Sequence, residues 1–151
     1  MTSTFKNTLI TIVGPTAIGK TALSIDLAKQ FKSDVISCDS RQFYKEMNIG
    51  TAVPSAEELA AAPHHFIQNR SIFDAYNVGQ FEKEALTKLK ELFLKNPIQI
   101  MVGGSGLYVD AVLKGLDYFP EVNAAVREAL QNEFKEKGLT FLQNKLKELD
   151  A

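Results

Sequence analysis

A glycine-rich octapeptide near the N-terminus limits this chain to very few folds. Its residues are Gly14, Pro15, Thr16, Ala17, Ile18, Gly19, Lys20 and Thr21. It follows a β-branched apolar run, residues 8–13, and precedes a segment with apolar side chains at helical spacing. A GxxxxGK[ST] turn between a strand and a helix is the signature of a phosphate-binding loop, or P-loop. All eight residues are therefore candidates for binding a diphosphate or a nucleotide such as ATP.

Each part of this loop has a physical task. The glycines let the backbone curl so that successive N–H groups point inward, and the helix that follows adds the partial positive charge of its N-terminus. The Lys20 ammonium neutralises phosphate oxygens. The Thr21 hydroxyl is the group that faces a bound Mg²⁺ in such loops, so we expect Thr21 to be the metal ligand.

Strand-like and helical segments alternate through most of the chain. Short apolar runs at residues 8–13, 34–38 and 98–102 predict buried strands. A helix is predicted after the phosphate loop, and another is predicted from a capping box of Asn77 and Gln80 to just before Pro97. This alternation predicts an α/β fold, a P-loop NTPase-like parallel sheet flanked by helices.

The C-terminal segment has a different pattern. Beyond Pro120, apolar stripes at helical spacing run from Val122 to Phe134 and from Leu142 to Leu149, with Gly138 as a stop between them. We therefore predict a catalytic core over residues 1–118 and the start of a helical extension over residues 119–151. The last stripe meets no glycine or proline stop, which suggests a truncated chain.

Composition gives information about the cellular compartment but little about the reaction. The 151 residues carry a formal net charge of −1 and are 45% hydrophobic, values typical of a globular domain that neither favour nor exclude RNA as a partner. The one cysteine, Cys38, cannot form an internal disulfide, which favours a reducing cytoplasm. No apolar run is long enough to predict a membrane span. The adjacent His64 and His65 have no Cys or His cluster around them, so structural roles are favoured.

A polar tetrad follows the second predicted strand. Its residues are Asp39, Ser40, Arg41 and Gln42. The third predicted strand ends in Gly103 and Gly104 and lacks the aspartate that helps hold Mg²⁺ in nucleotide-hydrolysing P-loop proteins. Asp39 is then the strand-end carboxylate beside the phosphate loop, where it faces a nucleophile, and this favours group transfer over hydrolysis. Small-molecule kinases use the same arrangement, so these residues alone leave both classes open.

Four ordered segments resemble the tRNA dimethylallyltransferases, the IPP transferase family. They are GPTAIGKT at 14–21, DSRQFYKEMNIGTAVP at 39–54, PHHF at 63–66 and VGGSGLYVDAVLKGL at 102–116. The resemblance runs through essentially the whole chain and corresponds to the N-terminal half of a usual member. Three positions depart from the family pattern, Ile18 for serine, Val53 for lysine and Ser105 for threonine, and none of them removes a charged catalytic group.

The resemblance implies an activity and a set of roles. A dimethylallyl group passes from dimethylallyl diphosphate to N6 of the adenosine at position 37 of a tRNA, next to the anticodon, and diphosphate is released. By the same resemblance, Asp39, Lys20 and Thr21 are catalytic, and Asp39 accepts a proton from the N6 amine while Mg²⁺ accompanies the diphosphate. The tRNA contacts implied are Asp39, Ser40, Arg41, Gln42 and Ser105, and residues 119–151 are implied to be the start of a tRNA-binding insertion. A cytoplasmic monomer with no obligate protein partner is expected.

Three alternatives stay open at this level. An adenylate isopentenyltransferase prenylates free nucleotides by similar chemistry. A P-loop small-molecule kinase would bind ATP in the same phosphate loop and phosphorylate a hydroxyl near Asp39. A fragment that retains ligand binding without turnover is the third, because family members take further charged groups from their second half.

Overall fold

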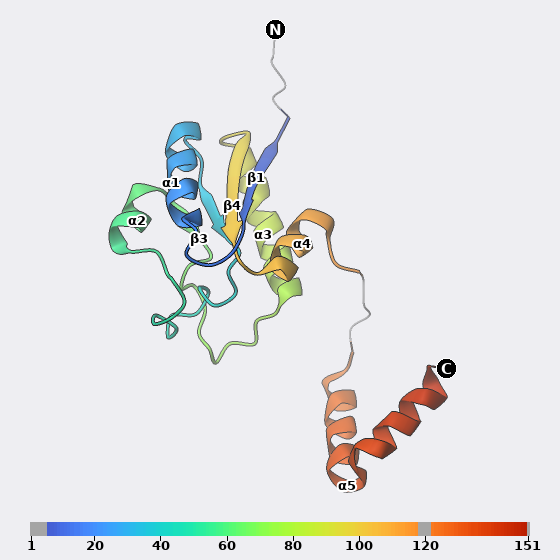
Figure 1. Ribbon diagram of the computed structural model, residues 1–151. Helices are drawn as coiled ribbons and strands as arrows, with labels where there is room; N and C mark the ends of the chain where they lie inside the picture. The colour runs from blue at the N-terminus through green and yellow to red at the C-terminus, as the bar shows by residue number, and fades with distance from the viewer. Residues whose placement is uncertain (1–5, 118–121, 151) are drawn as a thin grey trace. The chain divides into compact units, whose positions relative to one another are not determined.

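The computed structural model describes residues 6–117 and 122–150. The chain divides into two compact units, Met1–Leu116 and Asp117–Ala151, each described separately below (Figure 1). The boundary expected between residues 118 and 119 falls in the part of the chain outside the described residues. The assignment of the second unit to a tRNA-binding extension stays a prediction.

The first unit is built on a four-stranded parallel sheet with the order β1-β4-β2-β3 (Figure 1). Its strands are β1 (Thr8–Val13), β2 (Val35–Ser37), β3 (His64–His65) and β4 (Ile98–Gly103). The three strands predicted from apolar runs are confirmed. The two residues of β3 are too few to give a periodic pattern, so the sequence did not reveal this strand.

Helices cover both faces of this sheet. They are α1 (Lys20–Phe31), α2 (Ala56–Ala61), α3 (Val78–Phe93) and α4 (Gly106–Lys114). Val35 and Ile100 pack with apolar residues of α1, whereas their neighbours Ile36 and Met101 pack with α3 and α4. Successive strand residues point to opposite faces, so these central strands are buried on both sides. The expected parallel sheet flanked by helices is confirmed.

A local sequence signal sets the start of α3. The Asn77 side chain accepts from the Gln80 backbone N–H, and the Gln80 side chain accepts in return from the Asn77 N–H, each at 3.0 Å. This capping box satisfies two backbone donors that a helix start otherwise leaves free. The predicted start of the helix is confirmed.

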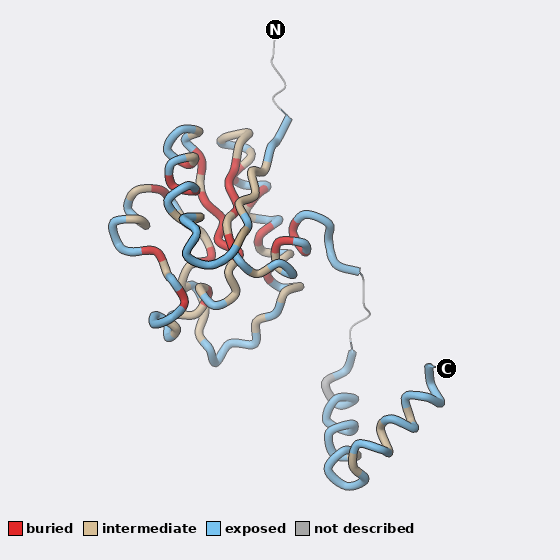
Figure 2. The backbone as a smooth tube through the Cα atoms, viewed as in Figure 1, coloured by how far each residue is buried: buried red, intermediate tan, exposed pale blue. Residues whose placement is uncertain are grey.

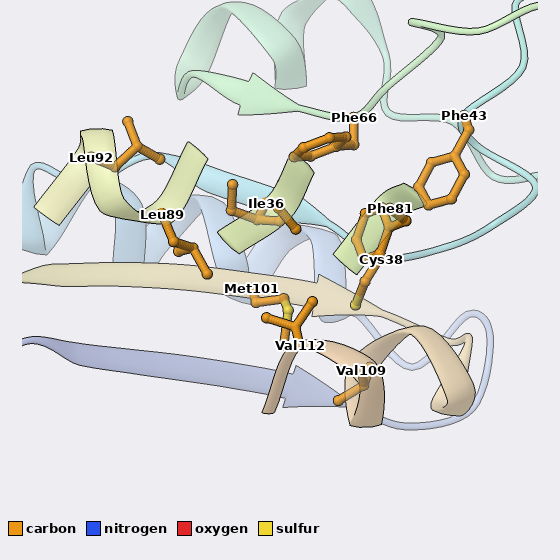
Figure 3. Packing of buried hydrophobic residues seen from close by; sticks show 11 residues of the cluster. Ile36, Cys38, Phe43, Phe66, Phe81, Leu89, Leu92, Met101, Val109 and Val112 are labelled. Carbon is orange, nitrogen blue, oxygen red and sulfur yellow. The ribbon is translucent and has the colours of Figure 1, made fainter. Parts of the chain in front are cut away.

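An aromatic cluster joins α3 to the chain that follows β2 (Figure 3). The rings of Phe43 and Phe81 are stacked with centroids 5.1 Å apart, and Phe66 meets Phe81 edge-on at 5.2 Å. Phe43 and Phe81 are fully buried. Burial of a phenylalanine contributes about 1.5–3 kcal/mol relative to exposure, so this cluster anchors the segment directly after the Asp39 tetrad.

The prediction that β1 is a buried strand was wrong. Among the described strands β1 pairs with β4 alone, so it lies at the edge of the sheet, and its residues are partly exposed (Figure 2). Val13, at its end, is 60% exposed. A β-branched run reports that a segment is extended and apolar, but it carries no information about how many strands lie beside it.

The second unit consists of α5 (Ala124–Leu149), which is two helical segments joined at Gly138. The backbone of Gly138 has φ 75° and ψ −178°, a conformation that glycine adopts without strain, so the predicted stop is confirmed. An ion pair between Lys145 and Glu133, 2.6 Å from Nζ to Oε2, links the two segments. No helix in residues 6–117 and 122–150 has the length and apolar composition needed to cross a membrane.

We predict that Gly103→Ala destabilises the first unit. A Cβ at this position would lie 2.5 Å from the carbonyl carbon of Cys38 and 2.6 Å from its Sγ, so the backbones of β4 and β2 would have to separate. The expected loss is about 1–3 kcal/mol in the free energy of unfolding, measured by urea titration. Gly106→Ala is the matched control, because a Cβ there meets nothing within 4 Å. Equal stability of the two variants would contradict this account.

Candidate active site

A cavity of about 320 Å³ opens at the carboxyl ends of the central strands. In open parallel α/β sheets this is the edge where ligands bind. Its wall is formed by the phosphate loop, the start of α1, the ends of β2 and β4, the segment leading into α2, and β3. Polar residues in this wall are Thr16, Lys20, Thr21, Ser24, Ser37, Asp39, Gln42, Glu58 and His64.

The phosphate loop has the curled backbone that its sequence predicted. Gly19, which caps the start of α1, has φ 93°, and Ala17 has φ 64°, so both lie in the left-handed region. Alternation of backbone conformation of this kind turns successive N–H groups inward and makes a concave site for anions. The Lys20 ammonium donates a hydrogen bond to the Pro15 carbonyl at 2.6 Å, which folds the side chain across the loop.

The eight candidate residues of the loop divide into two groups. Those that line the cavity are Thr16, Ala17, Gly19, Lys20 and Thr21. Gly14, Pro15 and Ile18 lie in the loop outside the cavity wall, and Ile18 is 67% exposed. The five that line the cavity carry the loop's ammonium and hydroxyl groups, so a phosphate bound in this cavity would meet those groups first.

Asp39 lines the same cavity from the end of β2. Cys38, just before it, donates its backbone N–H to the Val102 carbonyl at 2.8 Å and so continues the pairing of β2 with β4. The Asp39 side chain is 14% exposed. Gly104 leaves room beside it, since a Cβ at that position would lie 3.6 Å from Oδ2. The phosphate loop and the carboxylate therefore face one common space.

The Gln42 side chain, in the cavity wall, links the end of β2 to the loop before α2. Its Oε1 accepts from the Ser37 hydroxyl at 3.0 Å, and its Nε2 donates to the carbonyls of Thr51 and Ala52 at 3.2 and 2.7 Å. These three bonds use the carboxamide on both sides, so in this state Gln42 holds the loop before α2 against the end of β2. Its expected contact with a tRNA base stays a prediction.

Ser40 and Ser105 tie the ends of β2 and β4 together. The Ser105 hydroxyl oxygen accepts from the Ser40 backbone N–H at 2.9 Å, and the two hydroxyls are 3.1 Å apart. Neither residue belongs to the cavity wall. The departure from threonine to serine at this position keeps the oxygen that makes the link, and the predicted tRNA contacts of both residues remain untested.

His64 is a cavity residue that sequence reasoning missed. Its Nδ1 lies 2.7 Å from the Ala62 carbonyl, which can only accept, so Nδ1 carries the hydrogen. Its Nε2 is buried and has no hydrogen-bond partner among the described residues. His65 instead points away and meets the Asp34 carboxylate at 2.7 Å. Adjacent strand residues face opposite ways, which is why one histidine is structural and the other lines the cavity.

Cys38 lies outside the cavity wall. It is fully buried in the core beneath the cavity. Burial, with a smaller contribution from the nearby Asp39 charge, raises the pKa of its thiol to about 12. Only the thiolate is a good nucleophile, so Cys38 is an inert core residue, as the sequence indicated.

The wall suits a magnesium ion that arrives with its phosphate ligand. Residues 6–117 and 122–150 hold no group of three or more His, Cys, Asp or Glu side chains that could bind a metal alone. Thr21 offers a hydroxyl oxygen in the cavity, the kind of hard ligand that Mg²⁺ prefers. Mg²⁺ commonly keeps several waters and takes its remaining ligands from phosphate oxygens, so this donor set fits it.

Comparison with known proteins gives consistent results. The model of the IPP transferase family matches residues 42–151. A tRNA dimethylallyltransferase of Flavobacterium psychrophilum is 69% identical over 145 residues, which are 96% of this chain and 47% of that protein. One from Cytophaga hutchinsonii is 49% identical over 142 residues, 94% of this chain and 47% of that protein. The chain thus spans about half the length of the curated relatives it matches.

Solved structures share the fold. The full-length tRNA isopentenylpyrophosphate transferase of Bacillus halodurans superposes with a TM-score of 0.72 at 37% identity, over 96% of this chain and 48% of that one. A eukaryotic dimethylallyltransferase acting on tRNA gives 0.69 at 27% identity, over 80% and 31%. These likenesses confirm the P-loop NTPase-like fold predicted from the sequence. Since the family model covers most of its length, the chain belongs to the IPP transferase family.

Proposed function

We propose that the protein carrying this chain is a tRNA dimethylallyltransferase. It transfers a dimethylallyl group from dimethylallyl diphosphate to N6 of an adenosine at position 37, next to the anticodon of a tRNA, and releases diphosphate. The observation that carries this proposal is the shared cavity, which has an anion-binding loop on one side and the Asp39 carboxylate on the other. The names of its relatives support transfer to tRNA over transfer to a free nucleotide.

The reaction needs positively charged groups at the departing diphosphate and a proton acceptor at the attacking amine. The bond between C1 of the allyl group and the diphosphate oxygen breaks, and its electron pair leaves with the diphosphate. The N6 nitrogen forms a bond to C1, and its proton passes to the Asp39 carboxylate. Loop N–H groups and Lys20 stabilise the charge on the departing diphosphate. Thr21 would hold Mg²⁺ there, and the ion would supply further positive charge at the phosphate oxygens.

Lys20 has to exchange partners when the donor binds. In the free protein its ammonium is held by the Pro15 carbonyl. A diphosphate oxygen carries negative charge, so the ammonium gains an ion pair with it that the neutral Pro15 carbonyl cannot offer. The exchange therefore favours binding.

The partners follow from this chemistry. The base must leave its stack to reach the cavity, which proteins achieve most readily in unpaired loops of RNA. Asp39, Ser40 and Ser105 lie at the strand ends where such a base would arrive. We infer a cytoplasmic monomer that uses Mg²⁺ and no protein partner, and the reduced Cys38 supports that compartment.

Asp39→Asn should slow transfer by about two to four powers of ten, because the amide no longer takes the amine proton. The measurement is single-turnover transfer from labelled dimethylallyl diphosphate to unmodified tRNA with Mg²⁺, using the complete gene product. Affinity for diphosphate should stay nearly constant. Asp26→Asn, an exposed carboxylate on α1, is the matched control. Turnover unaltered by Asp39→Asn would remove this residue from its role.

The same assay separates the alternative activities. Labelled AMP in place of tRNA tests for a free-nucleotide prenyltransferase, and γ-labelled ATP tests for a kinase. We expect neither label to be transferred. Transfer to AMP at the rate seen with tRNA, or phosphate transfer from ATP, would contradict the proposed substrate pair.

Lys20→Met should weaken binding of Mg²⁺–diphosphate by about 10- to 100-fold, the value of one hydrogen bond to a charged partner. Isothermal titration calorimetry on this chain measures it directly. Lys29→Met, an exposed lysine on the same helix, controls for a general loss of positive charge. If both variants bound equally well, the diphosphate-binding site would lie outside the phosphate loop.

A further inference from the structure

Arg41 donates three hydrogen bonds to the Asp39 carboxylate. Its backbone N–H donates to Oδ1 at 3.2 Å, its Nε donates to the same oxygen at 3.4 Å, and its Nη2 donates to Oδ2 at 3.4 Å. A guanidinium is always charged and presents its donors in a fixed plane, which suits a carboxylate. The proposed proton acceptor therefore comes with its own orienting partner two residues along the chain.

The backbone fixes this partner in place. The Gln42 N–H donates to the Asp39 carbonyl at 2.9 Å and closes a turn that contains Arg41. Gln42 and Ser40 are bound in turn to neighbouring segments through their own hydrogen bonds. Arg41 thus reaches the carboxylate from a turn held on both sides, and little conformational freedom is lost in making the pair.

The two members of the pair face different surroundings. Asp39 lines the cavity and its side chain is 14% exposed, whereas the Arg41 side chain is 49% exposed and lies outside the cavity wall. Lys20, the cation within the cavity wall, is bound to Pro15. Arg41 therefore contacts the carboxylate from behind and leaves its cavity side to a substrate.

The two carboxylate oxygens are not equivalent. Oδ1 receives two donors from Arg41, and Oδ2 receives one long contact. Gly104 places no side chain against Oδ2, since an added Cβ there would lie 3.6 Å from this oxygen. The less strongly bound oxygen has the free lone pair that accepting a proton requires.

We propose that Arg41 is a positioning residue for the transfer reaction, in place of the tRNA contact that the sequence suggested. It holds Oδ1 and directs Oδ2 toward the amine. This role rests on the proposed function of Asp39. Because the guanidinium is half exposed and its contacts are long, solvent screens the pair, and the effect on rate is about 5- to 50-fold, well below that of losing Asp39.

A double-mutant cycle tests the inference in the complete gene product. The variants are Arg41→Met, Arg41→Lys, Asp39→Asn and the double variant Arg41→Met with Asp39→Asn. Arg41→Met should lower kcat by about 5- to 50-fold with the KM for tRNA unchanged. Arg41→Lys should recover part of the loss, because it restores the charge without the planar donors. In the Asp39→Asn background, Arg41→Met should have no further effect.

Other outcomes overturn the inference. A raised KM for tRNA with unchanged kcat would make Arg41 an RNA contact, and additive losses in the cycle would show that it acts independently of Asp39. Urea unfolding of each variant, beside the exposed-lysine control Lys90→Met, separates misfolding from a loss of positioning. Wild-type transfer with an additive cycle removes the inference alone, whereas no transfer by the wild type removes the proposed function and the inference together.

Discussion

Hydrogen bonding of β4 to β1 on one side and to β2 on the other brings the active-site elements together. The register pairs Val13 with Gly103 and Ser37 with Val102, so the loop after β1 and the tetrad after β2 leave the sheet at the same edge. Gly103 allows the close approach, since even one methyl group there would overlap Cys38. The cavity between the phosphate loop and the Asp39 carboxylate depends on this pairing, because within the described part of the chain no side-chain hydrogen bond links the two directly.

The charges of the site are paired in advance of any ligand. Lys20 rests on a carbonyl oxygen, and Asp39 is held by Arg41. In the proposed reaction a diphosphate would take over the Lys20 ammonium, while the guanidinium beside Asp39 would keep the carboxylate from repelling the anion at full strength. This arrangement is what the proposed function requires, an anion-binding loop and a carboxylate in the wall of one small cavity.

The long connection between β2 and α3 is held at several points around this site. Beyond the aromatic cluster, Arg70 pairs with Glu84 and lies 4.4 Å from the centre of the Tyr76 ring. The Tyr76 hydroxyl donates to Glu84 at 3.0 Å, and burial together with this carboxylate raises the pKa of the phenol. Contacts with α3 thus hold the chain that follows the tetrad. Gln42, the last residue of the tetrad, holds the loop before α2 through its bonds to Thr51 and Ala52.

Patterns along the chain were enough for the phosphate loop, the three longer strands, the capping box at Asn77, the break at Gly138 and the family itself. Each of these depends on residues a few positions apart, and local geometry links such residues directly. Four features required the folded chain: the edge position of β1, the strand β3, the place of His64 in the cavity and the contact of Arg41 with Asp39. Strand order pairs residues as distant as Thr8 and Ile98, and the hydrogen bond between Ser40 and Ser105 spans 65 positions, so spacing along the chain carries no record of either. For Arg41 the separation is only two residues, but its direction is set by the turn that those distant bonds hold in place.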